Sequence, residues 1–101
     1  MEKRKPHYRL ADIKSAFSDP DQLNRTVTAK QGADDLEMED DEVVEIIQAL
    51  TNADFDKSMT SYHDHKIWQD VYRPKLDDRT LYVKFTQDAQ QAFLIISFKE
   101  E

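Results

Sequence analysis

The stretch LYVKFTQDAQQAFLIISFK, residues 81–99, decides the fold that this sequence can adopt. Apolar residues occupy every second position at its start: Leu81, Val83 and Phe85. A period of two predicts a strand with one buried face. The polar residues 88–91 predict a turn, because aspartate tolerates the backbone angles of tight turns. The stretch therefore predicts a pair of antiparallel strands.

The second strand of this pair is predicted over residues 93–99. On its buried side we expect Leu94, Ile96 and Phe98, with Ser97 and Lys99 on the other. The exposed side of the sheet would carry Tyr82, Lys84 and Lys99. A sheet face that is polar, aromatic and cationic is where we expect a ligand.

The rest of the chain places helices before strands. Helices are predicted over residues 7–17, 28–38 and 40–51, after a short extended piece at 23–28. Further strands are predicted over residues 55–62 and 66–72, and a turn at 77–79. This order predicts an α+β fold in which N-terminal helices pack on one face of a C-terminal antiparallel sheet.

Length and composition narrow the class of protein. The 101 residues suit a single domain, residues 1–101. The chain has no cysteine, which excludes disulfides, thiolate zinc sites and cysteine nucleophiles. No apolar run follows the charged N-terminus, and none approaches the roughly 20 residues of a membrane span. We therefore expect a cytoplasmic protein without a membrane partner.

Charge is distributed unevenly along the chain. The net charge is −7, which argues against a simple nucleic-acid binder. Residues 31–56 hold ten acidic groups and no basic ones, whereas residues 1–30 carry an excess of three positive charges. The acidic segment is consistent with the start of the 40–51 helix and a solvated face. It could also dock or exclude a partner, and a cationic surface remains possible elsewhere.

Two catalytic chemistries receive weak support. His63 and His65 are two residues apart and would point the same way on a strand, but no third metal ligand has an obvious spacing. Surface or hydrogen-bonded histidines are the simpler interpretation. Ser58, Ser61 and Asp64 lie near these histidines, but no nucleophile elbow surrounds either serine. No glycine-rich phosphate loop is present, so no cofactor is predicted.

Metal-free cleavage of RNA needs other residue types. Attack of a 2′-hydroxyl on the adjacent phosphate needs a base, an acid and cations that stabilise the phosphorane. A tyrosine can move a proton if nearby cations lower its pKa, and lysine or arginine can hold phosphates. The C-terminal half supplies Lys57, Gln69, Arg73, Tyr82 and Lys99. By composition alone, such a set would also occur in a half-chain of many unrelated proteins.

The order of motifs along the chain indicates a family in which such residues have a function. The run DFDKSMTSYHDHKIWQDVYRPKL, followed by LYVK and LIISFKE, strongly resembles the MqsR family of bacterial toxins. The opening MEKRKPHYRL is also similar to the N-terminus of that family. The resemblance covers essentially the whole chain. It implies the RelE-like toxin fold and a messenger-RNA interferase that needs no metal.

The resemblance also implies roles for individual residues. The proposed catalytic residues of the family fall on Lys57, Gln69 and Tyr82, and a further implicated lysine falls on Lys99. We expect RNA contacts from Tyr62, Arg73, Lys75, Lys84 and Lys99, with Tyr72 as an alternative stacking residue. Family members cut single-stranded messenger RNA at GC-containing sites such as GCU. They are neutralised by an MqsA-like antitoxin, through which alone they would reach DNA.

One position departs from the family pattern. Asp56 precedes Lys57 where the family has a tyrosine, and on a regular strand we expect its side chain on the face opposite Lys57. A carboxylate beside a phosphate-binding lysine would weaken RNA binding. An alternative function is therefore a RelE-like module that binds antitoxin or RNA without cutting.

Overall fold

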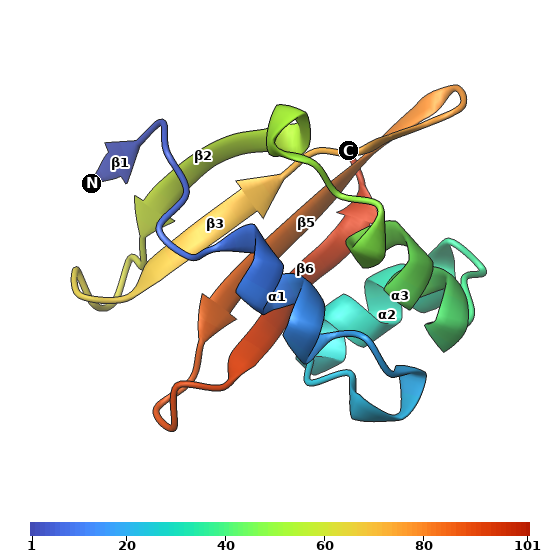
Figure 1. Ribbon diagram of the computed structural model, residues 1–101, viewed down its shortest axis with the longest axis horizontal. Coiled ribbons are helices and arrows are strands. Elements are labelled where there is room, and N and C mark those ends of the chain that lie inside the picture. Colours follow the sequence, from blue (N-terminus) through green and yellow to red (C-terminus); the bar gives the residue numbers. More distant parts are fainter.

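The computed structural model describes residues 1–101 and contains three helices and six strands (Figure 1). The helices are α1 (Leu10–Ala16), α2 (Val27–Asp35) and α3 (Asp40–Gln48), with short 3₁₀ turns at Pro20–Gln22 and Asn52–Asp54. The strands are β1 (Glu2–Lys3), β2 (Phe55–Thr60), β3 (Trp68–Tyr72), β4 (Lys75–Leu76), β5 (Arg79–Gln87) and β6 (Phe93–Glu100). None of the helices has the length and apolar character that crossing a membrane requires.

The strands form one antiparallel sheet. Strands β1, β2, β3 and β5 lie side by side in that order, and both β4 and β6 pair with β5. The three helices lie against one face of this sheet (Figure 1). The predicted α+β fold, with N-terminal helices on one face of an antiparallel sheet, is confirmed. The opposite face is referred to below as the open face.

The hydrophobic core lies between the helices and the sheet. Ile13 of α1, Ala29 of α2 and Ile47 of α3 are all fully buried there. From the sheet come Tyr72, Leu81, Val83, Phe85, Ile95 and Phe98. The alternation Leu81, Val83, Phe85 therefore faces the helices as the sequence predicted.

Local sequence explains where the helices begin. The side chain of Thr26 caps α2 by accepting a hydrogen bond from the amide of Ala29 at 3.1 Å. Helix α3 begins with a capping box between Glu39 and Glu42, so part of the acidic segment satisfies free amides at the helix start. Helix α2 ends at Asp35, three residues before the predicted end at residue 38, and Leu36 is its C-cap.

A buried carboxylate ties the N-terminal segment to the sheet. Asp70 of β3 is fully buried and accepts hydrogen bonds from the amides of His7 and Tyr8 at 2.9–3.2 Å. The hydroxyl of Ser58 on β2 donates to the same carboxylate at 2.5 Å. Because an unpaired buried charge is costly, these donors hold residues 7–8 firmly on β3. The two-residue strand β1, which no sequence pattern predicted, pairs with β2 next to this anchor.

The predicted faces of β6 were partly wrong. Lys84 pairs with Ser97 but Phe85 pairs with Ile95, so Ile96 is the extra residue of a β-bulge. The bulge shifts the alternation by one position. As a result Ile95 and Phe98 enter the core, whereas Leu94 and Ile96 are only half-buried.

Two segments near the N-terminus also differ in detail. Residues 23–28 were predicted as extended, and Arg25 does form an isolated bridge with Ile95 of β6. However, α2 already begins at Val27, because Thr26 provides its cap. The extended piece therefore ends before Val27, two residues earlier than the sequence pattern indicated.

A substitution at Gly32 tests the packing of α2 on the sheet. A β-carbon at Gly32 would lie 1.8 Å from the backbone oxygen of Phe98 in β6. We expect Gly32→Ala to destabilise the protein by about 1–3 kcal/mol through overpacking. Helix propensity alone would predict a gain of about 1 kcal/mol. Urea unfolding measures the difference.

The exposed residue Thr28 on the same helix provides the control. Thr28→Ala should change the free energy of unfolding by no more than about 0.5 kcal/mol. If the Gly32→Ala variant were as stable as the wild-type protein, or more stable, α2 would not approach β6 this closely.

Candidate functional site

The open face carries most of the residues that the sequence singled out. Lys57 pairs with Val71, Val71 with Lys84, and Lys84 with Ser97, so these four residues form one row across four strands. Paired residues point to the same side of a sheet. This row therefore lies opposite to the core-facing row of Tyr72, Val83 and Phe98.

Two further candidates flank this row on the same face. Gln69 lies two residues before Val71 on β3, and Tyr82 lies two residues before Lys84 on β5. Tyr82 pairs with Lys99 of β6. Residues two apart on a strand share a face, so Lys57, Gln69, Tyr82, Lys84 and Lys99 all lie on the open face, with Gln69 and Tyr82 on opposite flanks of the row.

Three lysines crowd the centre of the open face. Lys84 is half-buried, and this burial lowers the pKa of its ammonium group. The positive charges of Lys99 and Lys57 lower the pKa of Lys84 further. Val71 beneath them is fully buried even though it faces away from the helices. An anion placed over this cluster would relieve the repulsion between the three ammonium groups.

The environment of Tyr82 differs from the expected one. The Nζ atoms of Lys99 and Lys84 lie 5.3 and 5.6 Å from the centroid of its ring. We expected cations to lower the pKa of this phenol, but it is raised. Burial is the main cause, the carboxylates of Asp56 and Glu101 add to it, and only Arg73 opposes them. Tyr82 consequently keeps its proton at neutral pH.

A β-bulge in β2 explains why Asp56 affects this tyrosine. Phe55 pairs with Tyr72 and Lys57 with Val71, which leaves Asp56 as the extra residue. The expectation that Asp56 points away from the face of Lys57 was wrong. After burial, its carboxylate raises the pKa of Tyr82, and after the bond to Glu101 it adds to the raised pKa of Arg73. The Asp56 carboxylate also lies 3.9 Å from the guanidinium of Arg4.

Carboxylates also contact two of the cations. The guanidinium of Arg73, directly after β3, bonds to the Glu101 carboxylate. The Nζ of Lys57 lies 3.7 Å from the carboxylate of Glu2 on β1. Both pairs are partly exposed, so each contributes little stability and can exchange for another anion.

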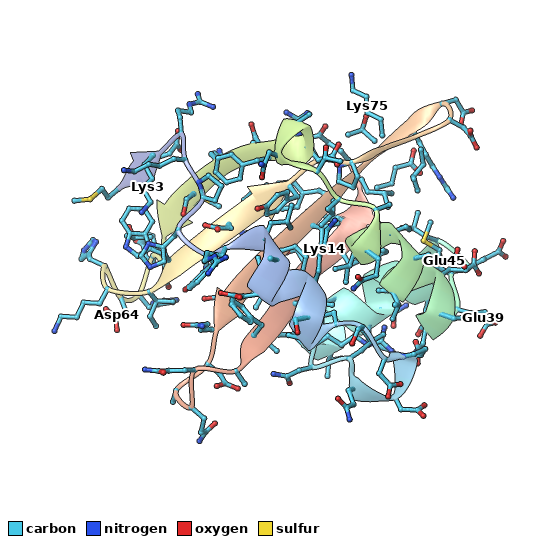
Figure 2. All side chains as sticks on the ribbon, viewed as in Figure 1. Lys3, Lys14, Glu39, Glu45, Asp64 and Lys75 are labelled. Atoms are coloured by element: carbon cyan, nitrogen blue, oxygen red, sulfur yellow. The ribbon has the colours of Figure 1, made fainter.

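Other predicted residues lie away from this cluster. Tyr62 is 93 % exposed in the loop between β2 and β3, where its ring meets His63 edge-on. Lys75 lies at the margin of the molecule in Figure 2, where it lines a depression with Glu45 and Ile46 of α3. Tyr72 cannot stack on a base, because its side chain is fully buried in the core.

The histidine pair does not form part of a larger ligand set. His63 and His65 are exposed in the loop between β2 and β3. No group of three histidine, aspartate or glutamate side chains is arranged to hold a metal ion. The sequence missed the contribution of Glu101 to the face and gave Asp56 the wrong orientation, because neither a bulge nor a pairing across strands leaves a signal in the local pattern.

The sheet of this small α+β protein has one face covered by helices and one open, cationic face. These features define a class of protein that is suited to binding a polyanion. Residues 5–100 match the family described as "Motility quorum-sensing regulator, toxin of MqsA". Over all 101 residues, and over the full length of both chains, the protein is 45 % identical to the mRNA interferase toxin MqsR of Escherichia coli K12. The chain therefore belongs to the MqsR toxin family, and the resemblance seen in the sequence is confirmed.

The bulge at Asp56 can be tested through the titration of Tyr82. Asp56→Asn removes a negative charge that raises the pKa of this phenol, so the pKa of Tyr82 should fall. The measurement is a pH titration of the tyrosine Cζ resonance by ¹³C NMR. The control is Asp12→Asn, which makes the same charge change at an exposed position of α1 and should leave the pKa of Tyr82 unchanged. An unchanged pKa in Asp56→Asn would mean that the carboxylate does not border the open face.

Proposed function

We propose that this protein is a metal-independent and ribosome-independent endoribonuclease toxin. It cleaves single-stranded messenger RNA at GC-containing sites such as GCU, leaving a 2′,3′-cyclic phosphate and a 5′-hydroxyl. The observation that carries this proposal is the convergence of Lys57, Gln69 and Tyr82 on one open face. Support also comes from membership of the MqsR family and from a relative named as an mRNA interferase.

In the proposed reaction the 2′-oxygen bonds to phosphorus while the bond from phosphorus to the 5′-oxygen breaks. The leaving 5′-oxygen needs a proton. Tyr82 supplies it as general acid, because its raised pKa keeps the phenol protonated at neutral pH. Tyr82 is thus assigned the role of general acid only, whereas the sequence alone left both the acid role and the base role open.

The proton of the 2′-hydroxyl needs an acceptor on the same face. Lys84 is assigned this role, because its lowered pKa makes the neutral amine accessible at lower pH than in a free lysine. Lys57 and Lys99 stabilise the charge on the phosphorane. Gln69 orients the scissile nucleotide by hydrogen bonds from the adjacent strand β3, and Arg73 holds a flanking phosphate.

The remaining expectations concern partners and the outer RNA contacts. Tyr62 and Lys75 would meet only nucleotides distant from the scissile bond, given their places at the loop tip and the margin. The protein is proposed to act as a single domain in the cytoplasm without a cofactor. An MqsA-like antitoxin would neutralise it and provide its only route to DNA.

Removal of the Tyr82 hydroxyl tests the acid role. Tyr82→Phe should slow cleavage of a GCU-containing RNA by about 10²–10⁴-fold, the usual contribution of a general acid. Cleavage is followed in excess EDTA, in which the wild-type protein should keep full activity. Tyr72→Phe is the matched control, because the buried Tyr72 hydroxyl has no hydrogen-bond partner. Full activity of Tyr82→Phe, or loss of wild-type activity in EDTA, would contradict the mechanism.

A charge-preserving substitution separates the two roles of Lys84. Lys84→Arg keeps a cation for phosphate binding but removes a base, because a guanidinium does not lose its proton in proteins. We expect single-turnover cleavage to fall by about 10²-fold or more while RNA affinity stays within a few-fold. Lys99→Arg, a matched change on β6, should keep most of the rate. A wild-type rate in Lys84→Arg would leave this residue with phosphate binding alone.

One observation favours a second function, a module that binds RNA without cutting. Asp56 adds a carboxylate to the open face, beside the proposed acid Tyr82. The same assays separate the two functions. Stoichiometric binding of the RNA with no cut ends after prolonged incubation would favour the binding module.

A further inference from the structure

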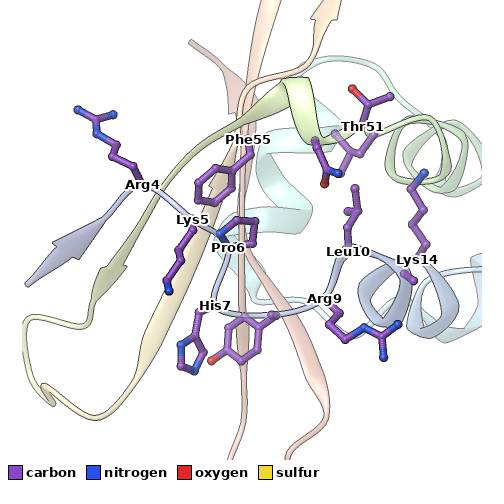
Figure 3. A pocket seen from close by; sticks show the side chains of 13 residues that line it. Arg4, Lys5, Pro6, His7, Arg9, Leu10, Lys14, Thr51 and Phe55 are labelled. Atoms are coloured by element: carbon purple, nitrogen blue, oxygen red, sulfur yellow. The ribbon is translucent and has the colours of Figure 1, made fainter.

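A second cationic surface lies outside the open face. A groove of about 920 Å³ runs between the N-terminal segment, α1 and the connection from α3 to β2 (Figure 3). It is called the N-terminal groove here. Its floor is apolar, with Leu10, Leu50 and Phe55, and its charged lining residues are Arg4, Lys5, Arg9 and Lys14.

The charge of the N-terminal groove differs from that of the chain. Acidic residues outnumber basic ones 21 to 14, yet no acidic side chain lines the groove. The only acidic partner of Arg4 is Asp56 at 3.9 Å, and Lys5, Arg9 and Lys14 form no ion pair. These cations are therefore available to an anion from solution.

The wall that carries these cations is held in place. The amides of His7 and Tyr8 donate to the buried Asp70 carboxylate, and the Tyr8 hydroxyl donates to the carbonyl of Trp68 at 2.9 Å. The His7 ring stacks on Trp68 at 5.2 Å between centroids. A fixed backbone reduces the ordering cost when a ligand binds to the side chains. In Figure 3, Arg4 and Lys5 lie on one side of Pro6, and Arg9 and Lys14 on the other.

The N-terminal groove and the open face meet at the bulge of β2. Phe55 lines the groove, and the next residue, Asp56, borders Tyr82 on the open face. Arg4 connects the two surfaces, since it lines the groove and reaches the Asp56 carboxylate. A strand that leaves the open face past Asp56 would meet Arg4 first and then the other three cations.

We propose that the N-terminal groove binds the phosphates of a single-stranded RNA segment that flanks the cleavage site. This inference rests on the proposed function, and it adds a second, sequence-independent binding site to it. Arginine and lysine bind phosphates through charge and hydrogen bonds without reading bases. An acidic protein segment would match the charge as well. Continuity with the open face favours RNA, because one chain can then occupy both surfaces.

The test compares two RNA lengths on two matched variants. The groove variant is Lys5→Gln, Arg9→Gln and Lys14→Gln combined. The control variant, with the same change in net charge, combines Lys30→Gln, Lys66→Gln and Arg79→Gln, which lie outside the groove. Affinity is measured over a range of salt concentrations. The ligands are 2′-fluoro RNAs, which cannot be cut, of about 6 and about 30 nucleotides, since a small single-strand site covers roughly 4–16.

The groove variant should lose about 10–100-fold in affinity for the long RNA and show a salt dependence weaker by up to about 2 in slope. Its affinity for the short RNA, and its cleavage of an unmodified short RNA, should stay close to wild type. The short-RNA cleavage rate reports on the proposed function alone, so the two proposals can fail separately. A charge-preserving variant, Lys5→Arg, Arg9→Lys and Lys14→Arg, should retain the long-RNA affinity, which guards against a folding defect.

Three results would overturn the inference. The groove variant could bind the long RNA like wild type, which would point to another ligand such as an acidic protein. Long and short RNA could lose affinity equally, so that no flanking segment is involved. The control variant could lose as much affinity as the groove variant, which would reduce the effect to net charge.

Discussion

The hydrogen bonds of the buried Asp70 carboxylate support both cationic surfaces of the protein. A carboxylate at this depth requires donors, and the chain provides two amides from the N-terminal segment and the hydroxyl of Ser58. These bonds attach the N-terminal segment to β3, where it forms one wall of the N-terminal groove. The neighbours of Asp70, Gln69 and Val71, point the opposite way into the open face. One side chain thus connects the position of the groove with that of the proposed catalytic residues.

Two β-bulges give the open face its particular chemistry. The bulge at Ile96 shifts the alternation of β6, so that Ile95 as well as Phe98 reaches the core while Lys99 stays beside Tyr82. The bulge at Asp56 brings a carboxylate towards the same tyrosine and raises the pKa of its phenol. By raising this pKa, the second bulge disfavours the phenolate that a base role for Tyr82 would need. It also adds negative charge to a surface that is proposed to bind RNA, and so limits affinity there.

The excess of negative charge is concentrated on the helical side of the protein. The acidic segment at residues 31–56 caps α3 and forms local ion pairs, such as Arg25 with Asp40 at 2.6 Å and Lys30 with Asp34 at 2.8 Å. Helices α2 and α3 cover the sheet face opposite the open face (Figure 1). The acidic groups of α2 and α3 are thus separated from the lysines of the open face by the sheet and its core. This separation allows a chain of net charge −7 to carry an open face suited to an anionic ligand.

The sequence by itself determined the α+β class, the helices and the alternation that buries Leu81, Val83 and Phe85, because these depend on local hydrophobic period. Its ordered motifs also determined the family and named Lys57, Gln69 and Tyr82. Only the tertiary structure decided which residues share a face where a strand bulges, as at Asp56 and Ile96. It also decided that Tyr72 is buried, that Lys75 lies apart, and that the pKa of Tyr82 rises. These properties depend on strand register and on burial by distant residues, and neither is encoded in the pattern of neighbouring residues.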